Sequence, residues 1–185
     1  LLDIATGTGD IIFSIMDKNH TFIQKAIGCD LAEDMMSIGQ KKLSQKPYAN
    51  KVRFIKGDAC QLPFNDDSFD VVSISFGIRN VPNYEKALSE MKRVLKPNGD
   101  VLILEFSIPQ GLIFKGLYLF YFRYILPFLG GLLSGQMKAY RYLNQTVEQF
   151  PSVTEFGVLM QKVGFKKVNK QSLTGGISML YSGVS

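Results

Sequence analysis

The chain has 185 residues, of which 46% are hydrophobic and 20% are charged, and its formal net charge is +5. This length suffices for one domain with a sizeable core, and the composition is ordinary for a globular protein. The basic residues form no block of five or six, so the charge does not call for a nucleic-acid partner. Cys29 and Cys60 form no CxxC pair and are expected to be buried free thiols. The single histidine, His20, lies in a polar stretch, so we expect no metal site.

Residues 1–10 (LLDIATGTGD) predict a strand, a tight loop and the start of a helix, with Asp10 as the helix cap. Gly7 and Gly9 lack a Cβ, so the backbone there can approach a ligand closely, and the N–H groups of the helix start would face it. The dinucleotide fingerprint needs a third Gly where this chain has Ile12, which disfavours a nicotinamide or flavin dinucleotide. A tight turn without a ligand is the alternative.

The rest of the chain alternates predicted strands and helices. The strands are expected at 25–30, 52–56, 69–76, 101–106, 165–172 and 177–183, and the helices at 32–43, 84–95 and 153–163. Asn83 is the predicted cap of the helix at 84–95, and the turn at 96–99 (KPNG) ends that helix. This alternation predicts a parallel sheet with helices on both faces, whose ligands bind at the carboxyl ends of the strands.

Acidic residues follow two of these strands. Asp30 ends the second strand, roughly 20 residues after the Gly loop, where an acid commonly accepts hydrogen bonds from ribose hydroxyls. Asp58 and Ala59 follow the third strand, and Ser75 lies at the end of the fourth. A helix cap or a turn residue is the alternative for each Asp, but Asp3, Asp30 and Asp58 occurring in this order favours a nucleotide site.

Motifs along the chain resemble two nested groups of enzymes. The run Asp3-x-Ala5-x-Gly7-x-Gly9 resembles the first motif of class I S-adenosylmethionine (SAM) methyltransferases, which usually carry Gly at the place of Ala5. Further motifs occur at 57–59 (GDA), 62–64 (LPF), 67–70 (DSFD), 75–81 (SFGIRNV), 90–97 (EMKRVLKP), 104–107 (LEFS), 140–143 (YRYL), 150–151 (FP) and 173–177 (LTGGI). Together they resemble the ubiquinone/menaquinone biosynthesis C-methyltransferase family over essentially the whole chain, and that family often carries Ala at position 5.

The resemblance implies a fold and a cofactor. The fold would be α/β, a Rossmann-like class I methyltransferase with a seven-stranded, mostly parallel sheet, helices on both faces and a helical cap insert at about 108–150. The last strand would be antiparallel, and residues 1–185 would form a single methyltransferase domain. The chain opens without Met, and the family's helical segment ahead of the first motif is absent from it, so we expect missing upstream sequence. SAM would be bound by Asp3, Ala5, Gly7, Thr8, Gly9, Asp30, Asp58, Ala59 and Ser75.

The implied reaction is methylation of a ring carbon of a polyprenyl quinol, in menaquinone biosynthesis, ubiquinone biosynthesis or both. The ring carbon becomes nucleophilic when a quinol hydroxyl loses its proton, and no metal is needed. Arg79 is always cationic and suits a developing phenolate or an ordered hydroxide-like water, and Asn80 could orient the hydroxyl, so these two are the predicted catalytic residues. An Arg–carboxylate pair and a turn-forming Asn are the alternative. Tyr140 and Tyr142 are expected to pack rather than to contact the ring.

Residues 112–133 are very apolar and rich in aromatic side chains, and no acidic residue occurs between Glu105 and Glu148. The run is long enough to span a membrane, but Lys115, Arg123 and Pro127 interrupt it. We therefore expect an amphipathic cap that receives the prenyl tail and touches an anionic membrane surface from the cytoplasmic side. An ordinary buried helix or a homodimer contact is the alternative.

Three other functions remain open from sequence. Another small-molecule SAM methyltransferase would share the cofactor site. A catalytically silent SAM-binding scaffold of a quinone-synthesis complex is a second, although such a scaffold has no need of Asp3, Asp30 and Arg79. A dinucleotide oxidoreductase is the third, and the missing third Gly counts against it. The sequence does not choose between a naphthoquinol and a benzoquinol.

Overall fold

A computed structural model describes residues 1–109, 111–125 and 137–185 of the chain. Its centre is a seven-stranded sheet in the order β3-β2-β1-β4-β5-β7-β6. The strands are β1 (Leu2–Ile4), β2 (Ala26–Asp30), β3 (Val52–Lys56), β4 (Phe69–Ser75), β5 (Leu95–Phe106), β6 (Lys166–Leu173) and β7 (Ser178–Val184). The first five strands pair in parallel, and β7 is inserted antiparallel between β5 and β6. This confirms the predicted Rossmann-like sheet with its antiparallel last strand.

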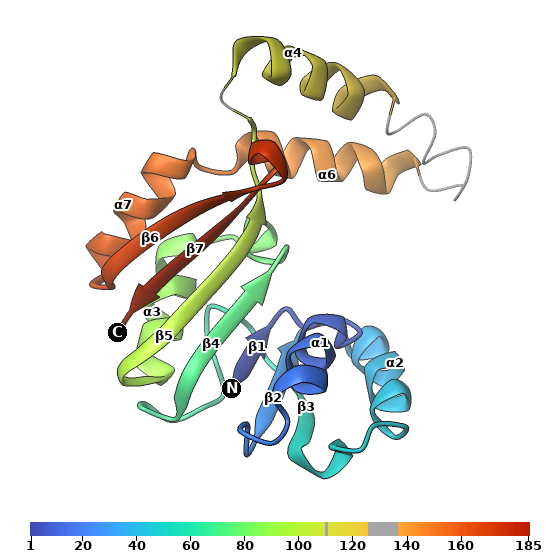
Figure 1. Ribbon diagram of the computed structural model, residues 1–185, viewed down its shortest axis with the longest axis vertical. Coiled ribbons are helices and arrows are strands. Elements are labelled where there is room, and N and C mark those ends of the chain that lie inside the picture. Colours follow the sequence, from blue (N-terminus) through green and yellow to red (C-terminus); the bar gives the residue numbers. More distant parts are fainter. Residues whose placement is uncertain (110, 126–136) are drawn as a thin grey trace.

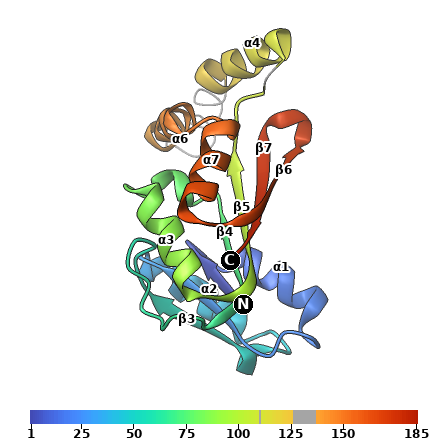
Figure 2. The same ribbon diagram turned by 90° about the vertical axis from the view of Figure 1, so that its left-hand side faces the viewer.

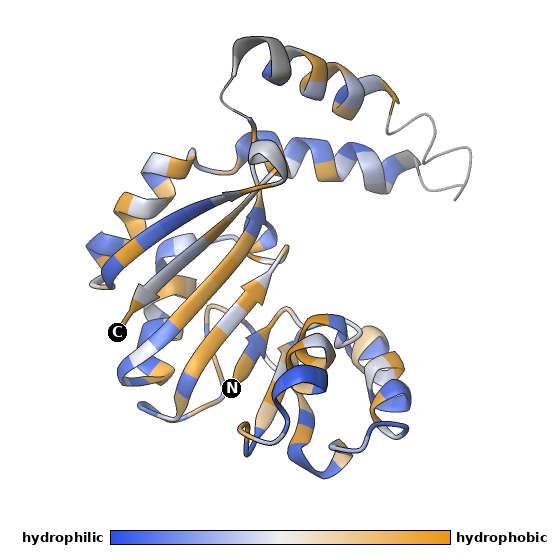
Figure 3. Ribbon diagram, viewed as in Figure 1, coloured by the Kyte–Doolittle hydropathy of each residue, from blue (hydrophilic) through white to orange (hydrophobic). Residues whose placement is uncertain are grey.

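Helices cover both faces of this sheet (Figures 1 and 2). On one face α1 (Asp10–Asn19) and α2 (Glu33–Leu43) pack over β1, β2 and β3, and on the other α3 (Tyr84–Val94) and α7 (Val153–Val163) pack over the central strands. The apolar face of α3 is fully buried against β4 and β5, as its helical spacing predicts. Figure 3 shows the hydrophobic central strands and a hydrophilic edge strand, β6. Lysines on such an edge discourage pairing with another chain.

The helix ends follow from local side chains. The Asn83 side chain accepts a hydrogen bond from the Lys86 backbone N–H at 2.9 Å, which confirms it as the cap of α3. A reciprocal pair of Ser152 and Glu155 hydrogen bonds caps α7, and Gly164, at φ 101°, ends it. The chain therefore enters and leaves both helices at positions that its sequence specifies.

Two sequence predictions about element ends are wrong. Asp10 is the first residue of α1 and not its cap, because Gly9 holds the cap position at φ 80° and the Asp10 carboxylate bonds Thr8 and Lys42 instead. The 96–99 turn does not separate α3 from a later strand. The chain joins the sheet directly at Leu95, which pairs with Phe69, and the turn, with Asn98 at φ 65°, lies within β5.

A helical cap lies beyond the carboxyl ends of the central strands (Figure 1). It contains α4 (Leu112–Phe120), the π-helical turn η3 (Tyr121–Ile125) and α6 (Met137–Gln149). Tyr118, Phe122 and Val147 form its small apolar core. The part of the predicted cap with Pro127, Phe128 and Gly130-Gly131 lies outside the described residues. Within the described ranges, no helix combines the length and the hydropathy needed to cross a membrane.

Candidate active site

A cavity of about 330 Å³ opens at the carboxyl ends of β1, β2, β3 and β4. Its volume falls in the range of small-molecule sites, roughly 300–1,000 Å³. We call one side of it the cofactor wall (Gly7, Asp30, Asp58 and Ala59) and the other the acceptor wall (Phe76, Gly77 and Asn80). Its other lining residues are Ile4, Ala5, Leu31, Met35, Gly57, Val81 and Pro82.

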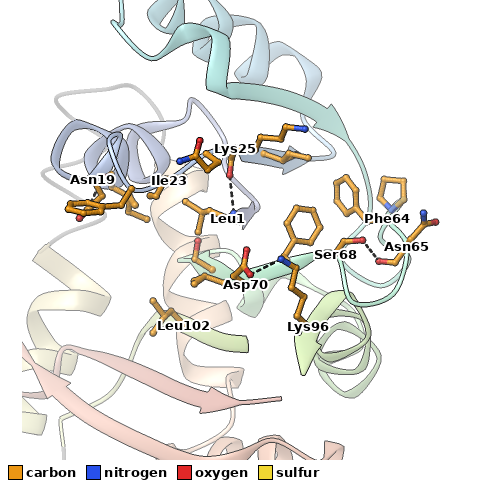
Figure 4. Close-up of a pocket in the computed structure, with 18 residues that line it drawn as sticks. Leu1, Asn19, Ile23, Lys25, Phe64, Asn65, Ser68, Asp70, Lys96 and Leu102 are labelled. Carbon is orange, nitrogen blue, oxygen red and sulfur yellow. Dashed lines mark hydrogen bonds and ion pairs between the residues drawn. The ribbon is translucent and has the colours of Figure 1, made fainter. Parts of the chain in front are cut away.

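A larger cavity, of about 1070 Å³, lies at the other end of the parallel strands, where they begin (Figure 4). Residues at the amino ends of strands line it, among them Leu1, Lys25, Asp70 and Lys96. The Leu1 backbone nitrogen donates to the Lys25 carbonyl at 3.1 Å, and Lys96 pairs with Asp70 at 2.7 Å. Because ligands of parallel sheets bind at the carboxyl ends of strands, the smaller cavity is the candidate active site.

Asp30 organises the cofactor wall. One carboxylate oxygen accepts the Gly7 backbone N–H at 2.7 Å, and the other accepts the Ala32 backbone N–H at 2.9 Å. The carboxylate therefore ties the Gly loop to the end of β2. Each oxygen keeps a further lone pair, which is what a ribose hydroxyl requires of an acceptor.

Two further features of the cofactor wall fit a nucleoside. Gly7 has φ 54°, and a Cβ at that position would approach the Met35 methyl group to 3.0 Å, so the loop stays close-packed without a side chain. Asp58 accepts the Cys60 backbone N–H at 2.8 Å, which fixes the turn that brings Ala59 to the cavity. A carboxylate for the ribose, a second polar turn and apolar side chains between them match the chemistry of SAM.

Asp3 lies beneath this site and does not line the cavity. Its side chain is 1% exposed, and its two oxygens accept the hydroxyls of Thr6 and Ser73, each at 2.7 Å. Burial raises the pKa of Asp3 to about 6, while the two hydroxyl hydrogen bonds oppose that rise. Asp3 thus supports the Gly loop from below.

The structure brings together some of the predicted site residues and leaves others outside the cavity lining. Thr8 donates its hydroxyl to Asp10, and Gly9 is required by packing, because a Cβ there would press on Phe54 and Phe13. Ser75 is in the sheet, paired with Leu104. The predicted residues that line the cavity are Ala5, Gly7, Asp30, Asp58, Ala59 and Asn80, and those outside its lining are Asp3, Thr8, Gly9, Ser75 and Arg79.

Arg79 makes the ion pair that the sequence left open as its alternative role. Its Nη1 donates to Glu105 Oε1 at 2.6 Å and to the Phe76 carbonyl at 2.5 Å. The guanidinium lies 5.2 Å from the centre of the Phe106 ring. Its Nε–H is buried and has no hydrogen-bond partner in the described part of the protein.

Asn80 connects the acceptor wall to the cap. It ends the short helix η2 (Ile78–Asn80), and its side-chain oxygen accepts the Tyr142 hydroxyl of α6 at 3.1 Å. Sequence reasoning assigned Tyr142 to packing and gave Glu105 no role. An acidic residue in the otherwise apolar run VLILEF was the signal for Glu105, but no local pattern pairs Tyr142 with Asn80.

The fold and this site together define a class I SAM-dependent methyltransferase. Solved structures support the fold. The SAM complex of phosphoethanolamine N-methyltransferase 2 from Haemonchus contortus matches 100% of this chain and 48% of that one, with TM-score 0.72 and 18% identity. A SAM-dependent methyltransferase from Aquifex aeolicus matches 99% of this chain and 80% of that one, with TM-score 0.69 and 18% identity.

The particular family follows from sequence comparison. The model of the ubiE/COQ5 methyltransferase family matches residues 1–185, and the chain belongs to this family. The ubiquinone/menaquinone biosynthesis C-methyltransferase UbiE of Geobacter sulfurreducens is 44% identical over 99% of this chain and 71% of its own length. The demethylmenaquinone methyltransferase of Thermus thermophilus is 43% identical over 99% of this chain and 81% of its own. The chain is therefore a SAM-dependent methyltransferase with SAM as its cofactor, which confirms the predicted family, enzyme class and cofactor.

Proposed function

We propose that this chain methylates a ring carbon of a polyprenyl quinol in menaquinone or ubiquinone biosynthesis. Membership of the ubiE/COQ5 family over residues 1–185 carries the proposal. The relatives from Geobacter sulfurreducens and Thermus thermophilus have names that refer to these two pathways. The cavity supports it as well, because a wall suited to a nucleoside adjoins a second wall with polar groups for an acceptor.

Bound SAM supplies an electrophilic methyl group on a positively charged sulfur. The quinol hydroxyl would lose its proton to a water molecule, and the resulting phenolate would place electron density on the neighbouring ring carbon. A carbon–carbon bond would then form as the methyl–sulfur bond breaks, with the electron pair of that bond remaining on sulfur. The ring proton leaves afterwards to solvent. The protein has to align two substrates, exclude water and stabilise the phenolate.

The residues divide these tasks between the two walls. On the cofactor wall, Asp30 accepts the ribose hydroxyls and Asp58–Ala59 border the adenine, with Asp3, Thr8, Gly9 and Ser75 supporting the loop and strand ends around them. On the acceptor wall, Asn80 orients the quinol hydroxyl, and Arg79, directly behind that wall, stabilises the phenolate through its positive charge. A cofactor wall that carries carboxylates, beside an acceptor wall with a cation behind it, is the arrangement that this reaction needs.

Methyl transfer from labelled SAM by the full-length protein tests the proposal. Reduced demethylmenaquinol and the demethylated ubiquinone precursor are the acceptors, and either one gaining label identifies the pathway. Arg79→Ala and Asn80→Ala should each lower kcat at least tenfold while the SAM Kd stays within about threefold, since one lost charge-assisted hydrogen bond corresponds to roughly 1.5–3 kcal/mol. Arg53→Ala, at an exposed arginine of β3, is the matched control with unchanged kcat.

The opposite result is equally specific. A wild-type protein that binds SAM but labels neither quinol would contradict the proposal and favour another acceptor or a silent scaffold. No binding of SAM by the folded full-length protein would contradict the placement of the cofactor wall.

We further propose that the cap touches an anionic membrane surface and lets the prenyl tail enter there. Leu117, Phe120 and Tyr124 are 64%, 58% and 65% exposed on α4 and η3, and Lys115 is exposed beside them. Exposed aromatic and basic side chains on a helix favour the interface of an anionic bilayer. The protein would then work at the cytoplasmic face of the membrane.

Flotation with anionic liposomes tests this contact. We expect binding at low salt that weakens as salt rises, because the electrostatic part is screened. The double variant Leu117→Ser/Phe120→Ser should lose binding, and Val158→Ser, at a residue 57% exposed on α7, should keep it. If the double variant abolishes a homodimer in sedimentation and leaves flotation unchanged, this face is a dimer contact and the membrane proposal is wrong.

A further inference from the structure

Glu105 is a buried carboxylate whose role the proposed reaction leaves open. It lies near the end of β5 in an otherwise apolar stretch, and its side chain is 0% exposed. Three N–H groups donate to it: Arg79 Nη1 at 2.6 Å, the Arg79 backbone N–H at 3.2 Å and the Phe106 backbone N–H at 2.7 Å. A buried charge persists only where such partners compensate its lost hydration.

These contacts hold the acceptor wall from behind. Glu105 binds Arg79 through both its backbone and its side chain, and Arg79 Nη1 also donates to the Phe76 carbonyl. Phe76 has φ 55°, a left-handed conformation that costs free energy for a residue with a side chain and needs support from its surroundings. The turn from Phe76 to Asn80 is therefore fixed at its first residue and near its last.

The same turn supplies the residues of the acceptor wall. Phe76, Gly77 and Asn80 line the cavity, and the Phe76 ring packs on Phe106 with ring centres 4.5 Å apart. Asp30 and Asp58, on the cofactor wall, make their hydrogen bonds with other backbone groups and have none with Glu105 or Arg79 in the described residues. A change at Glu105 therefore acts first on the acceptor wall.

We infer that Glu105 is a positioning residue for methyl transfer, which acts through Arg79 to hold the Phe76–Asn80 turn against the acceptor. This inference rests on the proposed quinol methylation. If Glu105 served only stability, its substitution would lower the melting temperature and leave kcat per folded molecule unchanged. If Glu105 is a positioning residue, its substitution lowers kcat and leaves SAM binding unchanged, because a small misplacement of groups near the reacting atoms slows the reaction strongly.

Glu105→Gln is the informative variant. Glutamine has nearly the same shape, but it replaces one acceptor oxygen with an NH₂ group and removes the negative charge. That NH₂ group would meet the Arg79 backbone N–H in place of Oε2, or Arg79 Nη1 and the Phe106 N–H in place of Oε1, so at least one of the three hydrogen bonds is lost. Glu90→Gln is the matched control: Glu90 also accepts an arginine, Arg93 at 2.7 Å, and a backbone N–H, Leu62 at 2.8 Å, but it lies on α3 outside the cavity lining.

The experiment measures kcat, the quinol KM, the SAM Kd and the melting temperature for the full-length protein and both variants. We expect Glu105→Gln to lose at least tenfold in kcat with the SAM Kd within twofold of wild type. We expect Glu90→Gln to lower the melting temperature with kcat unchanged. An unchanged kcat in folded Glu105→Gln overturns the inference, and so does an equal loss of kcat in the two variants.

A second variant covers the case in which Glu105→Gln does not fold. Glu105→Asp keeps the charge but shortens its reach by one methylene, so we expect a folded protein that binds SAM and loses at least threefold in kcat. Wild-type kcat in Glu105→Asp overturns the inference. A failure of the proposed function looks different, because the wild-type protein itself would then label neither quinol.

Discussion

The cofactor wall and the acceptor wall line one cavity but are stabilised by different kinds of contact. On the cofactor wall, the carboxylates of Asp30 and Asp58 accept backbone N–H groups, two of the three within two residues in sequence. On the acceptor wall, Asn80 is held by the side chain of Tyr142, 62 residues away. The turn that carries this wall is held by the ion pair of Arg79 with Glu105, 26 residues away. The cofactor wall is thus mainly a property of strand ends, and the acceptor wall depends on the meeting of distant elements.

This difference separates binding from chemistry. Backbone-held carboxylates at strand ends remain in place as long as the sheet is folded, so SAM binding should tolerate changes in the cap. The acceptor wall has a pair of side-chain contacts, one buried and one at the surface, that single substitutions can remove without unfolding the sheet. Variants should therefore divide into those that change the SAM Kd and those that change kcat.

The largest effect is expected from Asp30→Ala. This change removes the proposed acceptor for a ribose and leaves the Gly7 and Ala32 N–H groups without their partner. We expect the SAM Kd to rise at least 100-fold, since two hydrogen bonds to a charged group correspond to about 3 kcal/mol or more. Calorimetric titration with SAM measures it, and Asp34→Ala, at an exposed acid of α2, should bind as wild type. A Kd for Asp30→Ala within threefold of wild type would show that Asp30 only closes the loop.

Asp3, beneath the cofactor wall, makes the free energy of unfolding depend on pH. Its pKa is raised to about 6 in the folded protein by burial, against about 3.9 in an unfolded chain. The folded state therefore binds this proton more tightly, and its stabilising contribution is lost as pH rises from about 4 through about 6. The free energy of unfolding should fall by up to about 3 kcal/mol across that window because of this group.

Asp3→Asn isolates that contribution, because asparagine does not titrate and can still hydrogen-bond the Thr6 and Ser73 hydroxyls. Urea unfolding at several pH values between 4 and 7 should show a flatter profile for the variant than for wild type. Parallel profiles would mean that Asp3 titrates alike in the folded and unfolded chains.

Local sequence determines how much of this site could be predicted. The strand ends and the positions of Gly7 and Asp30 at the cavity were predicted correctly, because spacing of five to thirty residues along alternating strands and helices defines them. The contacts of Glu105 and Tyr142 were not predicted, since they depend on which distant elements the fold places beside Arg79 and Asn80. Asp10 was misassigned as a cap because an acidic residue after a Gly loop suits either position, and only the φ of Gly9 decides.

Ala5 and Gly77 provide a direct measure of coupling between the walls. Ala5, at φ 52°, belongs to the loop of the cofactor wall, and a Cβ added at Gly77 on the acceptor wall would overlap the Ala5 Cβ. We expect Gly77→Ala to lower the free energy of unfolding by about 2 kcal/mol, as an overpacked core position does. Combining it with Ala5→Gly should recover about 1 kcal/mol or more in a double-mutant cycle. Additive single effects would show that the two walls move apart freely.

The smallest and most selective effect is expected from Tyr142→Phe. The Tyr142 hydroxyl donates to the Asn80 side-chain oxygen, so the amide nitrogen of Asn80 is the atom left to donate toward an acceptor in the cavity. Without that hydroxyl, either end of the amide can face the cavity, and the cap loses a link to η2. We expect kcat/KM for the quinol to fall about threefold to tenfold, the equivalent of one neutral hydrogen bond.

The SAM Kd of Tyr142→Phe should remain that of wild type, because the Tyr142 hydroxyl donates to Asn80 of the acceptor wall. Tyr121→Phe, which removes a hydroxyl from a 46% exposed tyrosine of η3, is the control with unchanged kcat/KM. If Tyr142→Phe changed the SAM Kd and kcat/KM together, the division into two independently held walls would be wrong. A fall confined to kcat/KM would place the cap in control of the acceptor and leave the cofactor to the sheet.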